Sequence, residues 1–176
     1  MMLPRISILA FLVLLLLTGC DPARREAKAN FGEQGVTTFI LVRHAEKDYG
    51  TDPLLTPTGD SRAARLAEML SQTELAAVYS TDTHRTRLTA APAAEQAGLD
   101  TQIYDGQALT YFAHQLRRRH AGETVLVVGH SDTTPELANL LAKTETMARF
   151  SELDYGNLLV VSIPPVGKAG VLNLRY

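Results

Sequence analysis

The sequence predicts a three-layer α/β domain over residues 36–176, with a mostly parallel central sheet and an antiparallel edge. One observation is that short apolar runs alternate with stretches of helical periodicity from Thr37 onward. Another is that these runs lack polar alternation, which indicates strands buried on both faces. The last two runs are separated only by "PPVGKAG", residues 164–170. Because this segment is too short for a crossover helix, we expect the two strands to pair antiparallel.

The individual elements follow from the same patterns. Strands are predicted, in chain order, at residues 37–42, 76–80, 101–104, 124–129, 157–163 and 171–174. Apolar residues at helical spacing indicate amphipathic helices around residues 63–70 and 109–116. A shorter helix is predicted to begin at "TTPELANLL", with Thr134 as its N-cap and Pro135 at its first position.

Length and composition indicate one globular domain. The chain has 176 residues, of which 45% are hydrophobic and 20% charged. Its formal net charge is -2, so no global positive field exists to hold nucleic acid, and we expect no nucleic-acid partner. An anionic ligand would have to be bound by a local pocket.

The N-terminus, residues 1–19, has the pattern of a secretory signal. Arg5 precedes a largely apolar run of twelve residues, Ile6 to Leu17, and this run is shorter than the about 20 residues that a permanent membrane helix needs. The next stretch, "LTGC", contains the single cysteine of the chain and resembles the lipobox of bacterial lipoproteins. That resemblance implies cleavage before Cys20 and lipid attachment there.

The polar residues 20–35 are predicted to form a flexible tether between the lipid and the domain. The protein would then be anchored to a membrane of the cell envelope on its extracytoplasmic side, which is the periplasmic side in a Gram-negative cell. Inner and outer membrane both remain open.

Basic residues gather directly after three predicted strands. Arg43 and His44 follow the first strand, Arg85 and Arg87 the second, and His130 the fourth. In open parallel sheets, ligands bind beyond the carboxyl ends of the strands. If these strands are neighbours, two histidines and at least one arginine meet in one crevice.

Such a site suits phosphate chemistry. Forked guanidinium groups match the oxygens of a phosphoryl group, and a neutral imidazole can attack phosphorus and later be displaced by water. A zinc site built with Glu46, Asp82 or Asp132 is the competing interpretation. The sequence has no H-x-H or H-E-x-x-H spacing, and flanking arginines would repel a divalent cation. We therefore expect no metal and no other cofactor.

Four segments in order resemble the histidine phosphatase superfamily and its phosphoglycerate mutase-like fold. Arg43, His44 and Ala45 match the R-H-G or R-H-A motif, and "LTPTG" matches L-T-x-x-G. "STDTHRTRLTA" matches S-x-x-x-x-R-x-x-x-T-A, and "VVGHS" matches the segment of the second histidine. Together they span most of residues 37–141.

The resemblance implies a role for each matching residue. His44 would be the phosphorylated nucleophile, Arg43 and Arg85 would bind the phosphoryl group, and His130 would be the second histidine of the pocket. Arg87 falls outside the motif and is expected to be a solvated surface charge.

The general acid is where the sequence departs from the family. Ser131 stands where many members have an aspartate, and we expect it to contact substrate. Asp105 in "IYDGQAL" is the tentative acid, although an Asp before Gly also suits a turn. Asp132 and Glu46 are weaker candidates.

These observations favour a metal-independent phosphatase that hydrolyses phosphomonoesters or phosphohistidine through a phosphohistidine at His44. Its partner would be a small phosphorylated molecule or a phosphorylated envelope glycan. Two alternatives remain open: a catalytically inactive lipoprotein that binds a phosphorylated ligand, and an envelope scaffold without a small ligand.

Overall fold

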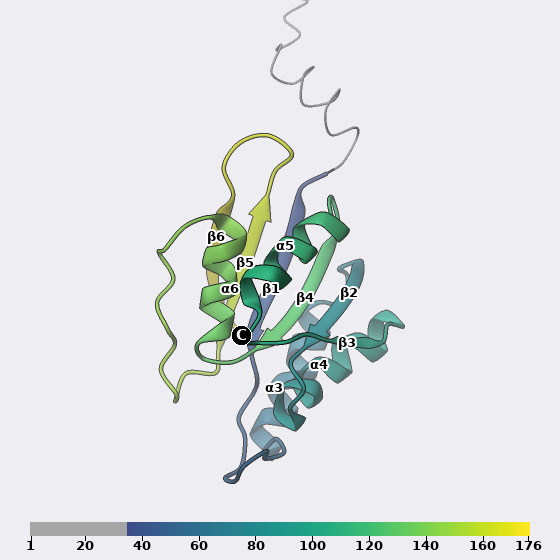
Figure 1. Ribbon diagram of the computed structural model, residues 1–176. Coiled ribbons are helices and arrows are strands. Elements are labelled where there is room, and N and C mark those ends of the chain that lie inside the picture. The colour runs from purple at the N-terminus through teal and green to yellow at the C-terminus, as the bar shows by residue number, and fades with distance from the viewer. Residues whose placement is uncertain (1–34) are drawn as a thin grey trace, which may run out of the picture. The chain divides into compact units, whose positions relative to one another are not determined.

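A computed structural model describes residues 35–176 of the chain (Figure 1). The predicted signal peptide, the lipid attachment at Cys20 and all of the 20–35 tether except its last residue lie outside the described residues, so they stay predictions. Within residues 35–176, none of the helices combines the length and the hydropathy that a membrane crossing requires.

The sheet has six strands in the order β3-β2-β4-β1-β5-β6. Their bounds are β1 Thr37–Arg43, β2 Leu75–Ser80, β3 Thr101–Ile103, β4 Thr124–Gly129, β5 Asn157–Ile163 and β6 Gly170–Arg175. The first four strands are mutually parallel, whereas β5 runs antiparallel to both β1 and β6. The predicted α/β sheet with an antiparallel edge is therefore confirmed.

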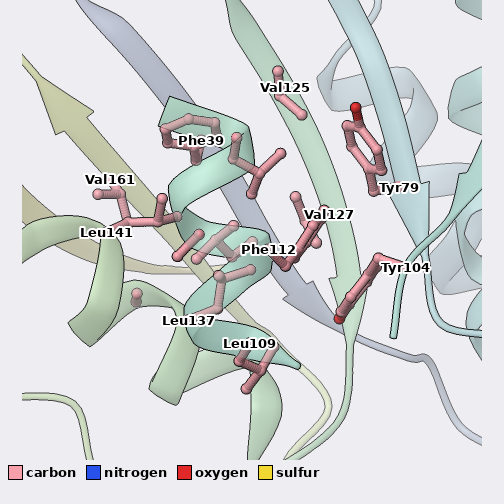
Figure 2. Packing of buried hydrophobic residues seen from close by; sticks show 14 of the residues in the cluster. Phe39, Tyr79, Tyr104, Leu109, Phe112, Val125, Val127, Leu137, Leu141 and Val161 are labelled. Carbon is pink, nitrogen blue, oxygen red and sulfur yellow. The ribbon is translucent and has the colours of Figure 1, made fainter. Parts of the chain in front are cut away.

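Helices cover both faces of this sheet. They are α3 Pro57–Met69, α4 His84–Ala97, α5 Leu109–Arg119 and α6 Thr133–Ala142. Figure 1 shows α5 and α6 in front of the sheet and the fainter α3 and α4 behind it. Figure 2 shows the apolar layer under α5 and α6, where Phe112 and Leu137 pack with strand residues such as Val127. A second apolar layer joins α3 and α4 to the opposite face. Burial of both faces explains the uninterrupted apolar strands.

The start of α6 differs from the prediction. The helix begins at Thr133, and Asp132 is its N-cap, with a side chain that accepts a hydrogen bond from the Thr133 amide. The predicted cap, Thr134, instead donates its hydroxyl to the Val42 carbonyl at 3.2 Å. The prediction was wrong because the Thr134 side chain bonds to the buried end of β1, so Asp132 is left to cap the helix.

Strand order explains how distant motifs come together. β4 lies between β1 and β2, and all three are parallel, so their carboxyl ends share one edge of the sheet. The residues that follow these ends are His44, Thr81 and His130. The general expectation that ligands bind beyond the carboxyl ends of parallel strands therefore points to this edge.

Candidate active site

A cavity of about 810 Å³ lies at this edge. His44 from the end of β1 and His130 from the end of β4 both line it, with ring centroids 5.5 Å apart. Arg85 at the start of α4 and Ser131 after β4 also line the cavity. Four of the residues predicted to share one crevice therefore do so.

The protonation state of His44 is set by its surroundings. Its Nδ1 lies 2.8 Å from the Ala45 carbonyl, which can only accept, so Nδ1 carries the hydrogen and Nε2 keeps a free lone pair. The side chain is buried, and this burial, helped by the positive charge of Arg43, lowers the pKa of His44 to about 3. The ring is therefore neutral at physiological pH and can act as a nucleophile.

The backbone beside His44 is held by α4. The Ala45 amide donates to Thr89 Oγ1 at 2.9 Å, and the Thr89 hydroxyl donates to the Arg85 carbonyl at 2.7 Å. The His44 amide donates to the Gly129 carbonyl at 2.9 Å. These bonds explain the threonine of the S-x-x-x-x-R-x-x-x-T-A segment, because they join the loop that carries His44 to the helix that carries Arg85.

The L-T-x-x-G segment holds the other side of that loop. The Thr56 amide donates to the Glu46 carbonyl at 2.9 Å, and Thr56 Oγ1 caps α3 by accepting from the Gly59 amide at 3.2 Å. A Cβ at position 59 would collide with the Glu46 backbone carbonyl, so only glycine allows this approach. The Glu46 carboxylate is bound by Arg62, whose hydrogen bonds lower the pKa of Glu46. Glu46 is thus committed to an ion pair.

His130 is a half-buried imidazole that is also neutral. Its Nε2 is 2.9 Å from Thr81 Oγ1, which belongs to the loop after β2. Burial lowers the pKa of His130, and Arg85 lowers it further. Glycine precedes it because a Cβ at Gly129 would lie within 2.9 Å of the hydroxyl oxygens of Thr133, Thr134 and Tyr104. The loop after β4 can therefore pack tightly against α6.

The two arginines of α4 have different surroundings. Arg85 lines the cavity, and its Nη1 is 3.4 Å from Asp52, while its Nε is buried without a hydrogen-bond partner. Arg87 is exposed and pairs with Asp82 at 3.2 Å. The prediction that Arg87 is a surface charge is confirmed. Arg85 remains available to an anion in the cavity.

Arg43 departs from the expected arrangement, because it lies beside the cavity and not in its lining. Its guanidinium donates from Nη1 to the carbonyls of Ser151 and Asp154, at 2.9 and 3.2 Å, and from Nη2 to Glu152 at 2.8 Å. It also stacks on the Tyr155 ring, 4.3 Å from the centroid. Arg43 is the last residue of β1 and His44 follows it. Successive side chains of extended backbone point to opposite sides, so the two side chains point in different directions.

The acid candidates have structural duties of their own. Asp105 lines the cavity, but its Oδ1 accepts from the Gln107 amide at 2.8 Å, which is the turn role considered from the sequence. Asp132 lines the cavity and caps α6. Ser131 donates its hydroxyl to Glu152 Oε1 at 2.7 Å.

Two residues of the site region were missed from the sequence, Glu152 and Tyr155. Both lie in residues 143–156, which contain neither helix nor strand. We call this the 143–156 segment. Its polar composition gives no periodic signal, and nothing local indicates that it folds back onto Arg43. Among residues 35–176, no three His, Cys, Asp or Glu side chains gather in a way that could hold a metal ion.

Comparison with known proteins agrees with this arrangement. The family model described as "Histidine phosphatase superfamily (branch 1)" matches residues 39–108, which include Arg43, His44 and Arg85. No curated protein sequence matches the chain. The match covers less than half of the chain, from within β1 to just before α5, so it is a similarity over this part of the chain.

Solved structures share the fold at low sequence identity. A mycobacterial glucosyl-3-phosphoglycerate phosphatase has a TM-score of 0.65 at 13% identity, covering 80% of this chain and 99% of its own. The protein histidine phosphatase SixA, solved with tungstate, has a TM-score of 0.64 at 18% identity, covering 78% and 96%. A phosphoserine phosphatase from Entamoeba histolytica, solved with 3-phosphoglyceric acid, has a TM-score of 0.60 at 18% identity, covering 80% and 97%. These likenesses establish the phosphoglycerate mutase-like fold.

Proposed function

We propose that this protein is a metal-independent phosphatase that hydrolyses phosphomonoesters or phosphohistidine through a phosphohistidine at His44. One observation carries the proposal: a buried, neutral His44, with Nε2 free, lines a cavity together with His130 and Arg85. Arginines beside the cavity favour an anion over a divalent cation. The family match and the phosphatases that share the fold support this activity.

The proposed reaction has two displacements. His44 Nε2 attacks phosphorus, the bond to the leaving oxygen breaks, and a phosphohistidine forms. Water then attacks that phosphorus, which releases inorganic phosphate and restores the neutral ring. Arg85 neutralises the oxygens in the transition state, and Arg43 adds a second guanidinium where the phosphoryl group reaches it. His130 would add a hydrogen bond from a ring N–H to a phosphoryl oxygen.

The leaving oxygen needs a proton when it is a poor leaving group. Asp105 is the tentative donor, and it would have to give up its hydrogen bond to the Gln107 amide. Until it does, esters with good leaving groups should react faster, because protonation contributes less to their departure. The substrate is proposed to be a small phosphorylated molecule, a phosphohistidine or a phosphorylated envelope glycan.

Trapping the covalent intermediate tests the mechanism. Full-length protein in detergent would be mixed with ³²P-labelled phosphate ester, quenched and separated by gel electrophoresis. We expect an acid-labile, alkali-stable label in wild type and in His114→Ala, since His114 is exposed on α5. His44→Ala should carry no label. Label retained in His44→Ala would refute the proposal. So would a wild type that neither carries label nor releases phosphate.

A binding protein without turnover is the second candidate. The turn bond of Asp105 favours it, because this bond occupies the carboxylate that would protonate the leaving group. A binder would be stabilised by phosphate or vanadate in a thermal melt, yet would release no phosphate from any ester. An envelope scaffold would show neither response.

We also propose that the protein is exported and held at a membrane of the cell envelope by lipid on Cys20. The signal pattern and the single cysteine support this. Expression with radiolabelled palmitate should label wild type and leave Cys20→Ser unlabelled. Equal label in both proteins, or in neither, would contradict the proposal.

A further inference from the structure

Glu152 is a carboxylate placed in the wall of a cavity proposed to bind phosphate. It lines the same cavity as His44 and His130. Its Oε2 accepts from Arg43 Nη2 at 2.8 Å, and its Oε1 accepts from Ser131 Oγ at 2.7 Å. Glu152 therefore occupies two donors that a phosphoryl oxygen would also seek.

The Glu152 carboxylate is negatively charged at physiological pH. Hydrogen bonds from Ser131 and Arg149 lower the pKa of Glu152 to about 2. Arg149 Nη2 lies 2.9 Å from Oε1, and both side chains are largely exposed. Even when Arg43 turns to another anion, Glu152 keeps two partners that hold it in place.

The cavity as a whole has an excess of negative charge. Its lining carries four carboxylates and two permanent cations, namely Asp82, Asp105, Asp132 and Glu152 against Lys47 and Arg85. Both histidines are neutral because burial lowers the pKa of each. A wall of this kind is unfavourable for a substrate that brings further negative charge besides its phosphoryl group.

The four carboxylates are not equivalent. Asp105 and Asp132 accept from backbone amides of their own turns, and these bonds persist whatever the cavity holds. Asp82 pairs with the exposed Arg87. Glu152 alone among the four is bound to an arginine that the proposed reaction needs. Binding of a phosphoryl group to Arg43 therefore takes a cationic partner from Glu152 and from none of the other three carboxylates.

From this geometry we infer that Glu152 determines specificity, selecting phosphomonoesters whose leaving group carries a positive charge, such as an alkylammonium, over those whose leaving group carries a carboxylate. The inference rests on the proposed function, because it requires the phosphoryl group to take Arg43. The carboxylate freed from Arg43 then faces the leaving group. It attracts an ammonium and repels a second anion.

This specificity would distinguish the protein from structural relatives with anionic ligands. One of them was solved with 3-phosphoglyceric acid, whose carboxylate would meet a carboxylate here. A purely structural ion pair predicts something else. If Glu152 only fastened the 143–156 segment to Arg43, its removal would change the affinity for all phosphorylated ligands by the same factor.

Three non-hydrolysable phosphonates of similar length separate these possibilities. The probes are 2-aminoethylphosphonate, propylphosphonate and 2-carboxyethylphosphonate, with binding measured by titration calorimetry on full-length protein in detergent. We expect wild type to bind the ammonium compound about tenfold more tightly than the carboxylate compound, which corresponds to about 1.4 kcal/mol. In Glu152→Gln this ratio should fall close to one.

The matched control is Glu145→Gln. Glu145 lies in the same 143–156 segment and is exposed beside a different hollow, so its loss removes the same charge without changing the cavity wall. This variant should keep the wild-type ratio. Thermal melts should show that both variants remain folded.

The outcomes are distinct from those that test the phosphatase proposal. An equal ratio in wild type and Glu152→Gln, no preference in wild type, or no binding of any phosphonate would overturn the inference. Phosphate release from p-nitrophenyl phosphate, measured in parallel, reports on catalysis. If wild type releases none but still prefers the ammonium compound, the phosphatase proposal fails and the specificity of the site stands.

Discussion

The two sides of the cavity are built in different ways. On the sheet side, His44 follows β1 and its amide donates to the Gly129 carbonyl, while the amide of the next residue, Ala45, donates to Thr89 Oγ1 of α4. On the other side, the 143–156 segment has no regular structure and holds Arg43 through two carbonyls and Glu152. The sheet therefore fixes the position of His44, the proposed nucleophile, while the irregular segment sets the charge around it.

Replacing Arg43 and Arg85 by alanine, one at a time, should show the largest difference in stability among these predictions. Arg43 is almost fully buried and bonds to the segment, so Arg43→Ala leaves a cavity and two carbonyls without donors. We expect it to lower the free energy of unfolding by about 3 kcal/mol. Arg85→Ala should change it by less than about 1 kcal/mol, because its one ion pair is long and partly exposed. Urea titrations would measure both.

Assays of phosphate release by the same two variants should show the opposite order of effects. Arg85→Ala should reduce phosphate release strongly although the protein stays folded, since its guanidinium faces the cavity. If Arg85→Ala unfolded the protein as much as Arg43→Ala, the two arginines would not differ in the way that the structure indicates.

The same contrast explains what could be predicted from the sequence. Strand ends are visible as apolar runs that stop at His44 and His130, and sheet topology then brings them together. Glu152 could not be found in this way, because its contact with Arg43 spans 109 positions and belongs to no periodic element. The cap of α6 failed for a related reason: the Thr134 hydroxyl prefers a tertiary partner, Val42. Local patterns predict elements and their ends, whereas side-chain partners across the fold need the structure.

Thr89→Val should test how the sheet side holds its loop. The change keeps the shape of the side chain but removes the acceptor of the buried Ala45 amide. An unsatisfied buried donor costs about 1–3 kcal/mol, so we expect a loss of about 2 kcal/mol in the free energy of unfolding and a lower rate of phosphate release. Thr89→Ser restores the hydroxyl and should recover most of both. Equal losses in the two variants would point to packing instead of the hydrogen bond.

His44→Gln should reveal the neutral histidine through its pH dependence. The pKa of His44 is about 3 in the folded protein and about 6.5 in the unfolded chain, so between these values only the unfolded chain gains a proton. Stability then falls as the pH drops below 6.5, by about 1.4 kcal/mol per unit, or about 2 kcal/mol at pH 5. Glutamine does not titrate, so the variant should lose about 2 kcal/mol less than wild type between pH 7.5 and pH 5. Parallel pH profiles of the two proteins would show that His44 is not held neutral.

Tyr155→Leu should produce the smallest effect and tests the irregular side, where the Tyr155 ring also lies 5.9 Å from the His44 ring. The Arg43 guanidinium carbon lies 4.3 Å from the centre of the Tyr155 ring, a cation–π contact worth about 1 kcal/mol. Leucine keeps apolar bulk but not the ring, so urea titration should show a loss of that size, with the position of His44 and its phosphorylation unchanged. Tyr155→Phe keeps the ring face and should match wild type. If Tyr155→Leu abolished the phosphoenzyme while Tyr155→Phe did not, the 143–156 segment would have to position the nucleophile as well as Arg43, and the division between the two sides of the cavity would be wrong.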